Sequence, residues 1–141
     1  MNPAAQSKLC DQDGPLNELA SLIARFSATD GACSTPIESL TLIRSTAPSA
    51  PLPTVYWPGL AIVAQGRKAF TLADECTEYG RGTYLLVSVE LPVSSRVIEA
   101  TPEVPYLCMY LGLDPGQIGR LMIEAGLPKP RSADVGRGVI V

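Results

Sequence analysis

Histidine is missing from this sequence of 141 residues. Because histidine is the commonest metal ligand and the usual general acid or base near neutral pH, its absence excludes histidine-based metal sites and Ser-His or Cys-His nucleophiles. The four cysteines, Cys10, Cys33, Cys76 and Cys108, form no Cys-x-x-Cys pair, so the spacing of a zinc site is lacking. Of the catalytic groups considered, only carboxylates are compatible with this composition. We therefore predict no catalytic residue, no metal and no cofactor, and a protein that is not an enzyme.

Long apolar runs and clusters of positive charge are missing as well. The longest apolar stretches, such as residues 84–87, fall far short of the ~20 residues of a membrane helix. The first eight residues show no charged segment followed by an apolar one, so we expect no signal peptide and a cytoplasmic protein. The 11 basic residues are scattered and the net charge is -3, whereas DNA binding needs concentrated Lys and Arg. We expect this chain alone to bind neither DNA nor a membrane.

The N-terminal part combines a polar segment with a helical pattern. Residues 1–14 are polar and predict a flexible arm. From residue 16 to residue 26 apolar side chains recur at helical spacing. Pro15 suits the first helical position, with Asp13 or Gly14 as the cap. These features predict a short amphipathic helix that covers a core.

After this helix the apolar period changes to two, which is typical of strands. The predicted strands cover residues 40–44, 60–64, 69–72, 75–79, 84–91, 93–100 and 106–113. Residues 47–53 carry three prolines and predict an extended loop, and residues 65–67 predict a hairpin turn between two strands. Further turns are expected at residues 73–74 and 80–82. Turn signals about every ten residues predict a β-sandwich or barrel.

The C-terminal part predicts one more helix and a linker. Residues 116–125 form a helical pattern that ends at Gly126, and we expect this helix to pack. Pro128 and Pro130 argue against a helix-turn-helix here. We read residues 15–127 as one domain between the arm (1–14) and a segment (128–141) that holds a linker and the start of a strand. The apolar run at the last residues predicts that the natural protein continues.

The predicted strand over residues 84–91 alternates between two kinds of side chain. One face carries Leu85, Val87, Val89 and Leu91, and the other carries Tyr84, Leu86, Ser88 and Glu90. If the second face points inward, Tyr84, Ser88 and Glu90 would orient a ligand inside the barrel. The alternative is that this face is exposed and that the leucines and valines fill the interior. The pattern leaves both arrangements open.

Two large aromatic residues, Tyr56 and Trp57, follow the proline-rich loop. They could form a lid over the mouth of a barrel, or anchor the loop to the core. Tyr106 and Tyr110 share one face of their strand with Cys108, where packing is the expected role. The candidate ligand-binding residues are therefore Tyr56, Trp57, Tyr84, Ser88 and Glu90.

Residues 55–68 (VYWPGLAIVAQGRK) and 79–93 (YGRGTYLLVSVELPV) have a specific order of turns, prolines and aromatics. Together with residues 100–107 (ATPEVPYL) and 111–115 (LGLDP), they resemble the N-terminal domain of one large branch of AraC-type regulators. The resemblance covers about residues 16–141. It implies a cupin-like β-barrel or jelly roll, with a short N-terminal helix and a helix after the last barrel strand. It supplies neither catalytic residues nor a ligand common to the family.

Three functions are compatible with these observations. The preferred one is an effector-sensing or dimerisation domain of a transcription regulator, whose helix-turn-helix half lies outside this chain. The second is a stand-alone cupin-type binding protein or metalloenzyme, which the absence of histidine disfavours. The third is an interaction module with a filled barrel. The resemblance implies three partners: a small-molecule effector, a second copy of the full-length protein, and DNA only through the missing half.

Overall fold

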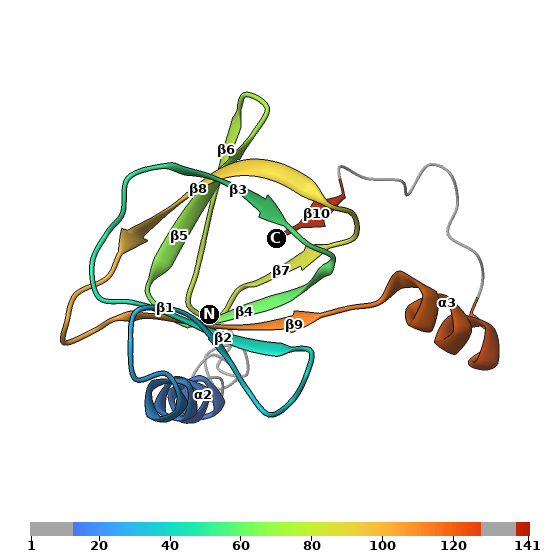
Figure 1. Cartoon of the computed structure of the whole chain (residues 1–141), viewed down its shortest axis with the longest axis horizontal. Helices are drawn as coiled ribbons and strands as arrows, with labels where there is room; N and C mark the ends of the chain where they lie inside the picture. Colours follow the sequence, from blue (N-terminus) through green and yellow to red (C-terminus); the bar gives the residue numbers. More distant parts are fainter. Residues whose placement is uncertain (1–12, 128–137) are drawn as a thin grey trace, which may run out of the picture.

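Two antiparallel β-sheets face each other in the computed structural model, which describes residues 13–127 and 138–141 (Figure 1). The strands are β1 (Gly31–Ser34), β2 (Leu40–Ser45), β3 (Leu52–Tyr56), β4 (Gly59–Gln65), β5 (Arg67–Leu72), β6 (Glu75–Gly80), β7 (Tyr84–Val87), β8 (Leu91–Glu99), β9 (Tyr106–Gly112) and β10 (Val139–Ile140). One sheet has the order β1-β2-β9-β4-β7-β10 and the other β3-β8-β5-β6. Helix α2 (Asp13–Phe26) precedes the strands and α3 (Pro115–Glu124) follows β9. The predicted fold class is therefore confirmed.

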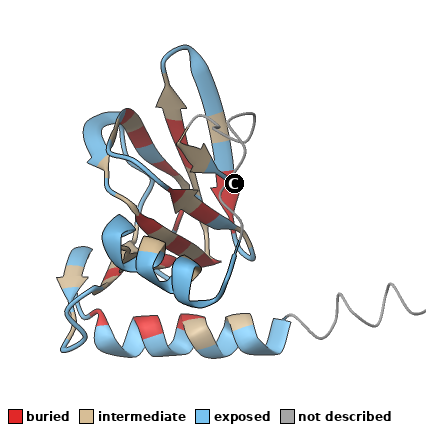
Figure 2. Ribbon diagram, turned by 90° about the vertical axis from the view of Figure 1, so that its right-hand side faces the viewer, coloured by how far each residue is buried: buried red, intermediate tan, exposed pale blue. Residues whose placement is uncertain are grey.

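Helix α2 covers the outer face of the six-stranded sheet, as its amphipathic pattern predicts. Its buried residues, Ala20 and Ile23, pack against Leu42, Ala64 and Leu107 of three neighbouring strands. Figure 2 shows buried stretches along part of this helix. Full burial of a leucine or isoleucine side chain contributes about 1.5–3 kcal/mol, so Ile23, Leu42 and Leu107 supply most of this stabilisation. The helix therefore closes a second, smaller core on the side of the sheet that faces away from the other sheet.

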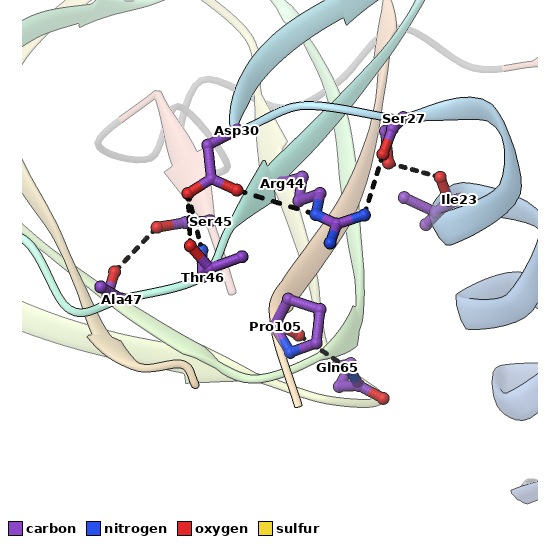
Figure 3. A network of polar contacts seen from close by, with 9 residues as sticks. All are labelled: Ile23, Ser27, Asp30, Arg44, Ser45, Thr46, Ala47, Gln65 and Pro105. Carbon is purple, nitrogen blue, oxygen red and sulfur yellow. Dashed lines mark hydrogen bonds and ion pairs between the residues drawn. The ribbon is translucent and has the colours of Figure 1, made fainter. Parts of the chain in front are cut away.

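A polar network holds the chain that leaves α2 (Figure 3). The Arg44 guanidinium of β2 donates a hydrogen bond of 3.0 Å to the carbonyl oxygen of Ser27. Asp30 accepts two hydrogen bonds from Thr46, from its backbone N–H at 3.0 Å and its hydroxyl at 2.7 Å. These bonds from Thr46 lower the pKa of the exposed Asp30 carboxyl. The helix and the sheet are thus joined at the point where the chain enters β1.

The chain changes sheet at Gly66, so the predicted hairpin over residues 65–67 is wrong. Strand β4 pairs with β7 and β9, whereas β5 pairs with β6 and β8 in the opposite sheet. Gly66 has a φ of 82°, and a Cβ there would lie 2.7 Å from the carbonyl oxygen of Glu99 and 2.9 Å from Cα of Tyr106. Alternation predicts that two strands exist but not which partners they take, because pairing is decided by long-range contacts.

The predicted strand over residues 84–91 is also divided between the sheets. Strand β7 ends at Val87 in the larger sheet, and β8 begins at Leu91 in the smaller one. The proline-rich loop predicted over residues 47–53 is shorter than expected, because β3 already begins at Leu52. Pro53 is tolerated there because β3 is an edge strand, where a missing N–H breaks no bond on the open side.

Helix α3 begins and ends as predicted, but it does not pack. The Asp114 side chain accepts a hydrogen bond of 2.8 Å from the N–H of Gly116, and Gly126 follows the helix with a φ of 67°. No residue of α3 is buried, and the helix projects away from the barrel (Figure 1). The expectation of a packed helix is therefore wrong for the residues that the structure describes. The predicted arm and linker fall largely on residues 1–12 and 128–137, outside the described ranges.

The Gly66 corner yields a test of the fold. Gly82 has a similar φ of 79°, but its Cβ would meet only Cδ1 of Leu16, at 3.4 Å. Gly82→Ala should therefore cost about 1 kcal/mol for the left-handed backbone alone. Gly66→Ala adds overlap with backbone atoms, and we expect its total cost to reach about 3 kcal/mol. Urea unfolding of both variants measures the difference, and equal costs would contradict the close approach at Gly66.

Candidate functional site

A cavity of about 370 Å³ lies between the two sheets. Its walls come from both sheets and combine aromatic, aliphatic and a few polar side chains. The lining residues are Ala32, Thr41, Ile43, Thr54, Val55, Tyr56, Trp57, Ala61, Lys68, Tyr79, Leu85, Val87, Tyr106, Cys108 and Tyr110. Thr54, Val55 and Trp57 are exposed, so the cavity reaches the surface beside β3. Its volume falls within the range of about 300–1,000 Å³ of small-molecule sites.

Strand alternation explains which side chains reach this cavity. On β9, Tyr106 and Cys108 point inward between the sheets, whereas Leu107 and Met109 point outward toward α2. On β5, Phe70 belongs to the core between the sheets, and Lys68, two residues earlier, lies on the same face. The short strand after the Gly66 corner therefore directs a lysine side chain into a largely apolar space.

Lys68 is the charged residue among those lining the cavity. Its ammonium nitrogen lies 5.8 Å from the centre of the Tyr56 ring and 5.9 Å from that of Tyr106. Such cation–π contacts offset part of the cost of removing the charge from water. Within the described part of the chain, Lys68 takes part in no ion pair and no hydrogen bond through its ammonium group. Burial therefore lowers the pKa of Lys68 below its ordinary value of 10.5.

The phenols around Lys68 are neutral at physiological pH. The hydroxyl groups of Tyr56 and Tyr79 are hydrogen-bonded to each other at 3.1 Å. Burial raises the pKa of Tyr56, of Tyr79 and of Tyr106, whose exposed fraction is 1%. Burial also raises the pKa of the Cys108 thiol. These groups offer polar atoms and ring surfaces but no negative charge, so the positive charge of Lys68 is not neutralised inside the cavity.

Two of the predicted ligand-binding residues, Tyr56 and Trp57, line the cavity. Tyr56 is half-buried and packs against Phe70, with ring centres 5.5 Å apart, while Trp57 is 56% exposed at the mouth. The hydroxyl of Tyr110 lies 3.0 Å from the carbonyl oxygens of both Trp57 and Pro58, to which it donates. The chain at the mouth is therefore tied to β9, on the opposite wall.

The other three candidates, Tyr84, Ser88 and Glu90, are exposed and do not line the cavity. A ligand role would require that face of β7 to point into the barrel. Instead, Leu85 and Val87 on the other face of β7 fill the interior. Ser88 and Glu90 lie beyond the end of β7, where the chain crosses to the other sheet. Leu85 and Val87 thus point inward, as in the alternative arrangement, and Leu91 packs against the core, whereas Val89 is 51% exposed.

A family model described as the N-terminus of AraC-type transcriptional regulators matches residues 36–141 of this sequence. The match covers more than half of the chain and every strand except β1, so it decides the family. The chain belongs to the AraC-type transcriptional regulator N-terminal family. This makes it a regulatory domain of such regulators, and the resemblance seen in the sequence is confirmed.

Other comparisons add little to this AraC-type domain. The crystal structure of a cupin protein from Bacteroides fragilis is similar at 14% identity over 84% of each chain, with a TM-score of 0.37. A similarity this loose carries no argument. No curated protein matches the sequence. Among the described residues, neither helix is long and apolar enough to span a bilayer.

The lining residues that the sequence did not predict as ligand-binding include Lys68, Tyr79, Tyr106 and Cys108. Tyr106 and Cys108 were placed on one face of a strand, but the pattern does not tell whether that face meets the cavity or a covering helix. Lys68 falls between the predicted turn over residues 65–67 and the predicted strand over residues 69–72, so the prediction assigns it to no strand face. The available signal was the two-residue spacing between Lys68 and the buried Phe70, which places both on one face.

The side chains of the cavity do not suit a metal ion. The chain has no histidine, and no group of three or more His, Cys, Asp or Glu comes together within residues 13–127 and 138–141. The lining groups are phenols, one ammonium and one thiol whose pKa is raised, and protonated cations repel metals. The lining therefore presents one cation and the faces of aromatic rings, not a set of metal ligands.

Lys68→Met should stabilise this domain at neutral pH, by about 1 kcal/mol, because it keeps the apolar stem and removes a charge that is costly to bury. Folding lowers the lysine pKa, so the penalty is full below the folded-state pKa. It disappears as pH rises from there toward 10.5. Urea unfolding of both proteins between pH 6 and pH 10 should show a gap that closes with rising pH.

The matched control is Arg96→Met, which removes an equal charge from an exposed position of β8. It should change stability little and without this pH dependence. A Lys68→Met protein that is less stable than the wild type at neutral pH would show that the ammonium is held by favourable contacts.

Proposed function

We propose that this domain senses a small-molecule effector, which binds in the cavity between the sheets. The observation that carries the proposal is a cavity of about 370 Å³ with an unneutralised lysine and four buried or half-buried tyrosines in its wall. Cores without a ligand role are normally filled and apolar, since buried charge is destabilising. An open space that contains one cation is typical of a binding site.

The position of the C-terminal strand supports a regulatory use of this cavity. Leu85 and Val87 of β7 line it, and Val87 is paired in register with Val139 of β10. The N–H of Ser88 donates a hydrogen bond of 2.8 Å to the carbonyl oxygen of Gly138. A ligand that packs against β7 would therefore change how firmly β10, a strand of two residues, is bound to β7. In regulators of this family the DNA-binding half follows, so this strand is a route for the signal.

A second role, self-association, is supported by α3. Leu121 is 62% exposed and Ile123 is 81% exposed, and no residue of the helix is buried against the barrel. Apolar side chains of this size on an unpacked helix favour contact with another protein surface. A second copy of the regulator is the partner that the family implies.

The single tryptophan makes effector binding measurable, because Trp57 stands at the cavity mouth. In a thermal-shift screen of small metabolites, we expect at least one compound to raise the melting temperature and to change Trp57 fluorescence. At 100 times its Kd a ligand stabilises by about 2.7 kcal/mol. Ala32→Phe, at an exposed position of the cavity wall, should weaken binding about tenfold by obstructing the space.

Ala28→Phe serves as the control, because Ala28 is exposed and lies outside the cavity. It should leave binding unchanged. A ligand that binds the Ala32→Phe and wild-type proteins equally would place the site elsewhere. A broad screen without any stabilising compound would contradict the sensing role.

The self-association role has its own test. Leu121→Asp places a charge in the exposed apolar part of α3, and we expect it to weaken pairing of this chain about tenfold in sedimentation experiments. Gln117→Asp changes an exposed polar position of the same helix and should leave pairing unchanged. Equal sedimentation of both variants and the wild type at all concentrations would exclude α3 as the interface.

A further inference from the structure

We propose that the cavity selects small molecules with one carboxylate and an apolar body, and that Lys68 is the residue that binds the carboxylate. The inference rests on the proposed sensing function and specifies the class of effector. It concerns one cavity, and its strongest support is the position and surroundings of a single cation.

The charge balance of the cavity favours an anion. Lys68 is the charged residue of the lining. Its neighbour Arg67 forms an ion pair with Glu78 on the outer face, so that carboxylate does not neutralise Lys68. A partly buried ammonium without a carboxylate loses hydration that only its ring contacts compensate. A ligand carboxylate would supply the missing negative charge, and hydrogen bonds between charged groups are roughly twice as strong as neutral ones.

The geometry leaves donors free for such a ligand. The rings of Tyr56 and Tyr106 flank the ammonium group, but no hydrogen-bond acceptor among the described residues engages it. The Tyr56 and Tyr79 hydroxyl groups are hydrogen-bonded to each other, and Ser95 and Tyr106 engage them further. The donors that a ligand carboxylate can use are thus the N–H groups of the Lys68 ammonium.

The remaining walls define the body of the ligand. Ile43, Ala61, Leu85 and Val87 are apolar, and the space of about 370 Å³ lies near the lower end of ligand sites. A single aromatic ring or a short aliphatic chain matches this surface. One lysine balances one negative charge, so a monocarboxylate fits better than a phosphate ester or a dicarboxylate.

Binding should depend on pH through Lys68 itself. The groups that face it, Tyr56 on β3, Tyr79 on β6, and Tyr106 and Cys108 on β9, have pKa values raised by burial and stay neutral. The lysine pKa is lowered in the free protein, and a bound carboxylate raises it again. As pH rises through the lowered pKa, carboxylate affinity should therefore fall, by up to about tenfold per pH unit.

The test uses pairs of probes of similar shape, one a carboxylate and one its neutral amide: benzoate with benzamide, 3-phenylpropionate with 3-phenylpropionamide, and hexanoate with hexanamide. Calorimetric titration and Trp57 fluorescence of the whole chain measure binding at constant ionic strength. We expect at least one carboxylate to bind at millimolar or lower concentration, roughly 10- to 100-fold tighter than its amide. Lys68→Met should remove this preference and leave amide binding unchanged, whereas Arg96→Met should keep the wild-type preference.

The outcomes separate this inference from the proposed function. If neutral compounds bind in the cavity but carboxylates hold no advantage, the anion assignment is wrong while effector sensing stands. If carboxylates bind equally well to the Lys68→Met protein, they occupy another site and the assignment to Lys68 fails. If neither these probes nor a broad metabolite screen gives binding, both the inference and the sensing role fail.

Discussion

The turn at Gly66 governs the arrangement of this domain, because it sends consecutive strands into opposite sheets. Its left-handed backbone and the 2.7 Å between a virtual Cβ and the Glu99 carbonyl leave room for glycine alone. Were β4 and β5 paired as a hairpin, both would lie in one layer and would enclose nothing between them. Instead the two sheets face each other, and the side chain of Lys68, two residues after the corner, is directed into the space between them.

The same arrangement creates a tension between stability and function. A lysine in that space costs folding free energy, and the aromatic rings of Tyr56 and Tyr106 reduce this cost without supplying a counter-charge. The phenols and the thiol are held neutral by burial, so they cannot pair with the ammonium. Residues that weaken a fold in this way are common at binding sites, where a ligand completes the interactions that the protein leaves open.

Much of the architecture was predictable, and the errors share one cause. The helix over α2, the turn at residues 80–82 and the end of α3 at Gly126 follow local rules of spacing and capping, which short segments obey by themselves. The hairpin over 65–67, the single strand over 84–91 and the packing of α3 required knowledge of distant partners. Of the predicted site residues, Tyr56 at the end of the edge strand β3 and Trp57 directly after it reach the cavity, whereas Tyr84, Ser88 and Glu90 face solvent.

By itself, the sequence determined the mainly β class, the helix that precedes the strands, the family and the lack of histidine chemistry. These features depend on composition, on the spacing of apolar residues and on the local order of residues. Only the tertiary structure decided which face of each strand is inside. On β9 both faces are buried, with Tyr106 and Cys108 toward the cavity and Leu107 toward α2, so polarity does not distinguish them. On β5 the charged side chain of Lys68 lies on the inner face, although charged side chains usually face solvent. The physical reason is that alternation separates two faces, whereas packing of distant strands and a helix decides what each face meets.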